Sequence, residues 1–193
     1  IPQLIYILSG SRFKIGTAGH ANFKKAFLAS RIYSQPFDFG FGNAGRHPFD
    51  GSFSGLQQQY LQLAMAGDPQ HIEPIDKDVA SAYLRLWGDE DQANRALFKQ
   101  HTITAENLTG YYSFPYAATA VHRKKDWAAL IKGYSKYVWA SEIYVASNRY
   151  GRYPANGTVQ LINAQGEKGS GFVQAGWDWN RFPGATVINL PIK

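Results

Sequence analysis

The sequence predicts an α+β protein in which helices come first and an antiparallel β region follows. As far as about residue 100, apolar residues recur at helical spacing, and Gly or Pro interrupts each run. Beyond Tyr111 the apolar segments become short, β-branched and aromatic, which is typical of strands. Helices followed by strands favour two domains over one mixed sheet. We place the boundary after residue 113, so that residues 1–113 form a helical domain and residues 114–193 a β domain.

Each helix is expected where an apolar stripe is bounded by a helix breaker. The first stripe ends at Ser9, and a loop at residues 16–20 separates it from the second. The predicted helices cover residues 4–8, 21–33, 56–66, 76–86 and 89–98. The predicted strands cover residues 116–122, 128–134, 138–144 and 158–162, with further strands near 171–173 and at 186–190. The HRKKD run at residues 122–126 is expected to be a solvent-exposed hairpin tip.

The composition narrows the class of partner. The chain has 193 residues, a formal charge of +6 and no cysteine, which excludes disulfides and thiolate metal sites. A basic excess favours a polyanion, which could be nucleic acid, an acidic lipid surface or an acidic polysaccharide. No apolar run is long enough to span a bilayer, and no nucleic-acid motif accompanies the charge, so we expect neither a membrane nor a nucleic-acid partner. The first residues resemble the middle of a helix and lack an initiating Met, so we expect a longer polypeptide.

A long segment between the second and third predicted helices is the first candidate for a functional site. It reads PFDFGFGNAGRHPFDGSFS, has no periodicity, and carries Arg46 and His47 at its centre. Long loops in compact domains are commonly functional. The alternatives are a solvated charge for Arg46 and a packed ring for His47.

Two further segments combine aromatic rings with polar groups that suit an anionic, sugar-like ligand. The first, SEIYVASNRYGRYPANG, contains Glu142, Asn148 and Arg149, and the second, GWDWNRFPGATVINLP, contains Trp177 and Asn180. An arginine fork matches a carboxylate or sulfate group, and aromatic faces stack on rings. Glu142 is either a site residue or an ordinary outward-facing strand residue, and the tryptophans could equally pack between domains.

Together with GRHPF at residues 45–49, these two segments resemble polysaccharide lyase family 8, and within it the chondroitin sulfate ABC lyases of bacteria. The resemblance extends over nearly the whole chain. It implies that the helices are the end of an incomplete α/α toroid and that the strands begin an antiparallel β-sandwich. Both domains would then be truncated, the first at its N-terminus and the second at its C-terminus.

The resemblance also implies β-elimination at a uronic acid of chondroitin or dermatan sulfate, and possibly of hyaluronan. Arg46 and Glu142 match the family's supporting arginine and glutamate, whereas its proton-transferring His and Tyr fall before the first residue of this chain. We therefore expect the chain alone to be inactive. Substrate contacts are expected from His47, Asn148, Arg149, Asn180 and Trp177.

The remaining expectations also follow from the resemblance. No cofactor is required, although a divalent cation such as Ca or Mg is possible in the longer protein. That protein is expected to be a secreted or periplasmic monomer that acts on an acidic polysaccharide. The alternative function, which the basic charge and the aromatic content also allow, is a binding module for acidic polysaccharide without catalysis.

Overall fold

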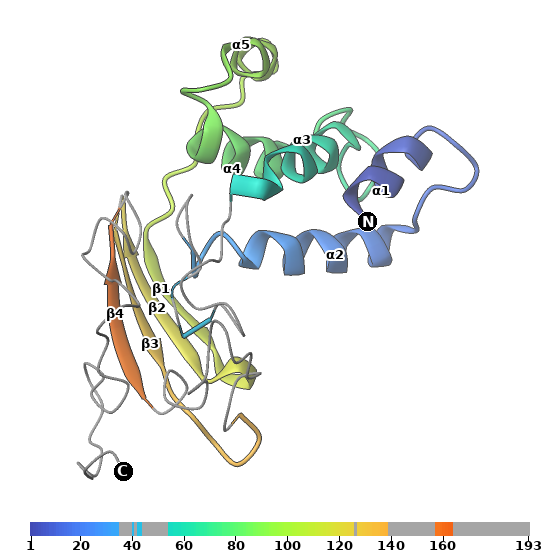
Figure 1. Ribbon diagram of the computed structural model, residues 1–193. Helices are drawn as coiled ribbons and strands as arrows, with labels where there is room; N and C mark the ends of the chain where they lie inside the picture. Colours follow the sequence, from blue (N-terminus) through green and yellow to red (C-terminus); the bar gives the residue numbers. More distant parts are fainter. Residues whose placement is uncertain (35–39, 41, 44–53, 126, 139–156, 164–193) are drawn as a thin grey trace, which may run out of the picture. The chain divides into compact units, whose positions relative to one another are not determined.

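The computed structural model describes residues 1–34, 40, 42–43, 54–125, 127–138 and 157–163 (Figure 1). The predicted strands near 171–173 and at 186–190, and all but the first residue of the one at 138–144, lie outside the described residues.

The described elements follow the predicted order of helices before strands. They are α1 (Pro2–Leu8), α2 (Thr17–Ala29), the 3-10 helix η1 (Ser54–Leu56), α3 (Gln57–Met65), α4 (Lys77–Trp87), α5 (Gln92–Gln100), β1 (Gly110–Phe114), η2 (Pro115–Ala117), β2 (Thr119–Lys124), β3 (Trp127–Lys132) and β4 (Thr158–Ile162). Helices followed by an antiparallel sheet confirm the α+β class.

The chain forms two compact units, and each is described by itself. The helical unit comprises Ile1–Arg31 and Ser54–Asn107, and the sheet unit comprises Ile32–Phe53 and Leu108–Lys193. The long segment between α2 and η1 therefore belongs with the strands, although it lies between helices in the sequence. The boundary predicted after residue 113 would fall inside β1.

The core of the helical unit consists of large apolar and aromatic side chains on α3, α4 and α5. Tyr60, Leu63, Val79 and Phe98 have no exposed surface, and Tyr83 is almost fully buried. The Tyr83 and Phe98 rings meet edge to face with centroids 5.8 Å apart, a favourable geometry for aromatic pairs. These contacts join α4 to α5 and explain why a short, polar helix such as α5 is held in place.

Helix α2 begins earlier than the sequence indicated. It starts at Thr17 with Gly16 at the N-cap, so the loop expected at residues 16–20 is wrong. The extra turn places His20 in the interior, where its side chain is fully buried. One turn later Lys24 bonds to Asp76, which is 1% exposed, with an N–O distance of 2.9 Å.

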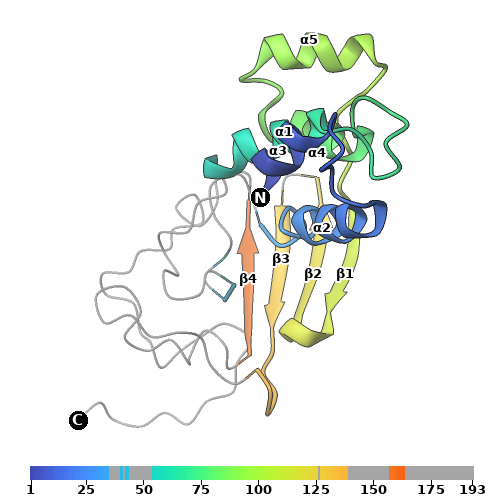
Figure 2. The same ribbon diagram turned by 90° about the vertical axis from the view of Figure 1, so that its right-hand side faces the viewer.

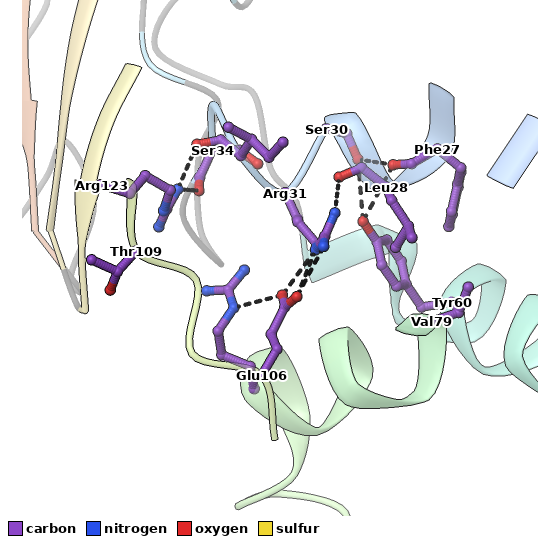
Figure 3. Close-up of polar contacts among 12 residues, drawn as sticks. Phe27, Leu28, Ser30, Arg31, Ser34, Tyr60, Val79, Glu106, Thr109 and Arg123 are labelled. Atoms are coloured by element: carbon purple, nitrogen blue, oxygen red, sulfur yellow. Dashed lines mark hydrogen bonds and ion pairs between the residues drawn. The ribbon is translucent and has the colours of Figure 1, made fainter. Parts of the chain in front are cut away.

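A cluster of three charged side chains ties distant parts of the helical unit together. Arg31 donates to Glu106 through Nε at 2.8 Å and Nη2 at 2.9 Å, and Arg85 donates to the same carboxylate at 3.0 Å (Figure 3). Arg31 and Glu106 are almost the last residues of this unit before the chain passes to the sheet unit. The bidentate geometry of Arg31 and Glu106 is the strong form of an arginine–carboxylate pair.

The sheet unit is built on four antiparallel strands in the order β1-β2-β3-β4 (Figure 2). The strand predicted at 158–162 is confirmed, since β4 has the same bounds. The strand predicted at 116–122 is displaced, because Pro115 begins a 3-10 turn and Ala118 adopts a left-handed conformation with φ of +48°. That turn separates β1 from β2, so the predicted strand overlaps β2 alone, and β1 lies before it without a predicted counterpart.

One face of this sheet, called here the inner face, is buried. Its core consists of Val121, Ala128, Leu130 and Ile162, and the partly buried Ile32, Tyr33, Tyr112 and Phe114 pack against it. Alternation along β2 and β4 places every second residue on this face, as a half-buried strand requires. The start of the long segment, at Ile32 and Tyr33, therefore packs against the inner face of the sheet.

Candidate functional site

The seven residues predicted for the site lie outside the described residues. They are Arg46, His47, Glu142, Asn148, Arg149, Trp177 and Asn180. The structure instead describes the framework from which two of the candidate segments depart, and the geometry of that framework is given below.

The segment that carries Glu142 leaves from one end of the sheet. Lys132 is the last residue of β3 and pairs in register with Thr158, the first residue of β4. Residues 133–157 therefore connect two neighbouring strands, a link that a tight turn of two residues can make. This long connection contains Glu142, Asn148 and Arg149.

The segment between α2 and η1, which carries Arg46, begins on the inner face. It starts beside Arg123, whose Nη1 donates to the carbonyls of Ile32 at 2.9 Å and Ser34 at 2.6 Å. A side-chain carbon built on Gly40 would lie 2.5 Å from Leu130 Cδ1, so the backbone passes directly over the sheet there. Gly40 also has a φ of +73°, which favours glycine.

This segment then reaches the end of the sheet from which the segment bearing Glu142 departs. A side-chain carbon on Gly42 would lie 3.2 Å from Lys132 Cβ and 3.5 Å from Thr158 Oγ1. Next to it, the Thr119 hydroxyl donates to Asn43 Oδ1 at 3.2 Å. Thr119, Lys132 and Thr158 form one register row across β2, β3 and β4, called here the end row.

The end row thus brings the start of the segment bearing Glu142 close to Gly42 and Asn43, which precede Arg46. Arg46 follows Asn43 by three residues, and Glu142 follows Lys132 by ten. The segment bearing Glu142 follows the end row directly in sequence, and the segment bearing Arg46 contacts this row at Gly42 and Asn43.

The basic charge is concentrated in residues 108–193, which include the strands of the sheet unit. Residues 108–193 contain ten Lys and Arg against four Asp and Glu, whereas residues 1–107 contain ten of each. The whole formal excess of +6 therefore belongs to residues 108–193. A region of one sign attracts polyanions and accelerates their encounter.

Sequence reasoning missed one arginine in this framework. The HRKKD run was expected to be a solvent-exposed tip, and Lys124 and Lys125 are indeed exposed, but Arg123 is fully buried. It shares the inner face with Val121, two residues earlier in β2. The alternation of apolar and polar residues along β2 was the available signal, and the adjacent lysines concealed it.

Three tyrosines are poorly suited to accept a proton from a substrate. Burial raises the pKa of Tyr33, and it raises the pKa of Tyr60 to about 12. Burial, together with the bond that Tyr83 donates to Asp91, raises the pKa of Tyr83 to about 12. A tyrosine base needs the opposite shift. These side chains serve the packing of their units.

The described residues contain no group of three or more His, Cys, Asp or Glu side chains that could hold a metal ion. Within the same residues, no helix has both the length and the apolar character needed to cross a bilayer.

Comparison with known proteins defines the class of the chain. Residues 1–93 match the family model described as "Lyase, catalytic", and residues 109–192 match "Polysaccharide lyase family 8, super-sandwich domain". The chain therefore combines parts of the catalytic and the β regions of a polysaccharide lyase. It belongs to polysaccharide lyase family 8.

Curated relatives cover almost all of this chain. It is 41% identical over 193 residues to the chondroitin sulfate ABC endolyase of Proteus vulgaris, with 99% of this chain and 18% of that protein aligned. It is 34% identical to the chondroitin sulfate ABC exolyase of Bacteroides thetaiotaomicron, with 98% of this chain and 21% of that protein aligned. The chain thus spans about a fifth of the length of these relatives.

A solved structure shares the fold. The Streptomyces coelicolor A3 chondroitin AC lyase, as its Y253A mutant, superposes with a TM-score of 0.65 and 18% identity, over 99% of this chain and 30% of that chain. This likeness agrees with the α+β class described above.

Proposed function

We propose that the chain is part of a longer lyase that cleaves chondroitin sulfate and dermatan sulfate by β-elimination at uronic acid. The proposal includes hyaluronan as a further substrate. The proposal is supported by the family, by relatives named chondroitin sulfate ABC lyases, and by the basic excess of residues 108–193. The observation that carries it is the end row, from which the segment bearing Glu142 departs and which the segment bearing Arg46 reaches at Gly42 and Asn43.

The reaction explains why these two residue types are needed. The C5 proton of a uronic acid is weakly acidic, because its removal places negative charge beside a carboxylate. Hydrogen-bonding or cationic groups must neutralise that carboxylate in the transition state. A base must take the C5 proton, and an acid must protonate the departing glycosidic oxygen.

In this proposal Arg46 and Glu142 support the proton transfer, which a Tyr and a His of the longer polypeptide perform. The Arg46 guanidinium favours the ionised form of the tyrosine and contacts the bridging oxygen. Glu142 orients its neighbours and balances the charge. His47, Asn148, Arg149, Asn180 and Trp177 contact the polysaccharide, and the chain by itself has no turnover.

The first prediction concerns Arg46. In the longer polypeptide, Arg46→Ala should abolish formation of the unsaturated product, which is followed by its ultraviolet absorbance, because the transition-state charge is left without its cation. Arg95→Ala is the matched control, since the Arg95 side chain is 53% exposed and pairs with the exposed Asp89 in the helical unit. Activity retained by Arg46→Ala would remove this residue from the mechanism.

A binding module without catalysis is the second candidate, favoured by the charge of residues 108–193. The coding sequence upstream of Ile1 separates the two functions. A His and a Tyr encoded there support the lyase, and their absence supports the binding module.

We further propose that the longer protein is a secreted or periplasmic monomer, with a divalent cation as an optional component.

A further inference from the structure

The buried arginine of β2 makes polar contacts that packing alone does not require. Arg123 is fully buried, and its Nη1 holds two carbonyls, those of Ile32 and Ser34, which belong to the segment leading to Arg46 (Figure 3). Ser34 is itself 1% exposed. A guanidinium removed from water is costly unless protein acceptors replace the lost hydration. An apolar residue of similar volume would fill the same space without that cost.

We propose that Arg123 is a positioning residue for the elimination reaction, in that it fixes the start of the segment that carries Arg46. The proposal rests on the function proposed above. Its basis is that two points before Arg46 are bonded to the sheet. Arg123 binds the start of the segment at Ile32 and Ser34, and Thr119 donates to Asn43 further along. Arg46 follows the second attachment by three residues.

Between the two attachments, the described residues lie close to the sheet. Ile32 packs on the core of the inner face, and the backbone at Gly40 and Gly42 runs close to β3 and β4. We infer that a shift of the start of the segment would also displace the residues that lead to Arg46. A displacement of about 1 Å at a catalytic group lowers a rate by roughly a hundredfold.

Arginine suits this position better than lysine. Its planar group presents several N–H donors in a fixed arrangement, so that one side chain holds two carbonyls in one geometry. A lysine reaches the same region with a flexible stem and a compact charge. It should therefore restore part of the geometry and part of the rate.

The test compares Arg123→Met and Arg123→Lys in the longer polypeptide. For Arg123→Met we expect kcat to fall roughly ten- to hundredfold with KM changed less than about twofold, because the substrate contacts remain. Displacement of Arg46 would raise the pKa of the tyrosine base, so the acidic limb of the kcat–pH profile should move to higher pH. Arg123→Lys should recover part of kcat and shift the limb less.

Arg85→Met is the matched control, since it removes a mostly buried arginine that donates to Glu106 in the helical unit. It should lower the melting temperature and leave kcat and the pH profile unchanged. If Arg123→Met changes only the melting temperature, as Arg85→Met does, the proposal is overturned. If Arg123→Met fails to fold, the pH profile of Arg123→Lys decides, and an unshifted profile overturns the proposal.

The Arg46→Ala experiment keeps the two proposals separable. An inactive Arg46→Ala with an unshifted Arg123 variant overturns the positioning role alone. An active Arg46→Ala overturns the lyase mechanism and the positioning role together.

Discussion

At the scale of single residues, His20 shows how a buried ring couples stability to pH. The side chain is fully buried in α2, and neither ring nitrogen has a hydrogen-bond partner within the described part of the chain. Burial lowers the pKa of His20; Asp76 and Asp68 oppose this shift, and His71 and Lys24 add to it. The folded helical unit thus favours the neutral imidazole.

The direction of the pH effect follows from proton binding. Below the ordinary histidine pKa of about 6.5, the unfolded chain binds a proton that the folded chain does not, so the free energy of unfolding falls as pH falls. The loss stops once the pH is below the lowered pKa of the folded state. Above about 6.5 both states are neutral and the effect vanishes.

His20→Leu should therefore flatten the acid dependence of stability. Urea unfolding of the chain at several pH values between about 7.5 and 5 measures this, with a smaller decline expected in the variant than in the wild type. His101→Leu is the matched control, because His101 is exposed at the end of α5 and should leave the decline unchanged. Equal declines in the wild type and His20→Leu would show that another group carries the acid sensitivity.

Single residues also show where the sequence was insufficient. The candidates Arg46 and Glu142 came from the motifs that carry the family resemblance, and their roles stay predictions. Arg123 was missed because the lysines beside it made the whole run look solvated. Its burial depends on the carbonyls of Ile32 and Ser34, about 90 residues away in sequence, and no local pattern indicates such a contact.

At the scale of elements, α4 illustrates a helix whose start was readable from the sequence. Asp76 precedes the apolar stripe, and its Oδ1 accepts from the backbone N–H groups of Asp78 and Val79 at 3.1 Å. This is the expected N-cap arrangement. Its buried Oδ2 additionally pairs with Lys24 of α2, which only the folded structure reveals.

Two substitutions separate the cap from the ion pair. Asp76→Asn keeps a capping oxygen and loses the charge, whereas Asp76→Ala loses both, so Ala should cost roughly 2–4 kcal/mol of unfolding free energy and Asn clearly less. Thermal and urea unfolding measure both values. Asp78→Ala serves as the control, since the Asp78 side chain is 71% exposed and its bond to Lys24 should contribute less than about 1 kcal/mol. Equal costs for Asn and Ala would mean that capping contributes nothing here.

Other element boundaries were harder to predict for identifiable reasons. The first turn of α2 contains Gly19 and follows Gly16, and both residues suggest a loop, yet the buried His20 and Leu28 hold the helix in place. The strand after residue 116 was misplaced because the left-handed Ala118 carries no signal of its own. Tertiary packing overrides local preference in both cases.

At the scale of the whole molecule, the order of helices and strands was predictable, but the membership of residues 32–53 was not. That segment lies between helices in the sequence and belongs to the sheet unit, because Ile32, Ser34 and Asn43 bond or pack to strands that occur much later. Contacts of such sequence separation leave no periodicity to detect.

The uneven charge predicts which half of the chain meets an acidic polysaccharide. Lys136→Glu, in the exposed turn after β3, should weaken the binding of chondroitin sulfate roughly two- to tenfold at low salt. Lys25→Glu in α2 makes the same charge change in the balanced half and should have little effect. Titration at rising ionic strength should diminish the difference. A larger loss from Lys25→Glu would assign binding to the helical half.

The 25 residues between β3 and β4 have a consequence for how such lyases diversify. Because the end row closes the connection at its base, the loop could lengthen or shorten without disturbing the register of the strands. The match to the Bacteroides thetaiotaomicron exolyase extends over 214 residues, more than this chain contains, so insertions do separate the two proteins. We expect them to accumulate at this connection, where a change in loop length leaves the sheet constant.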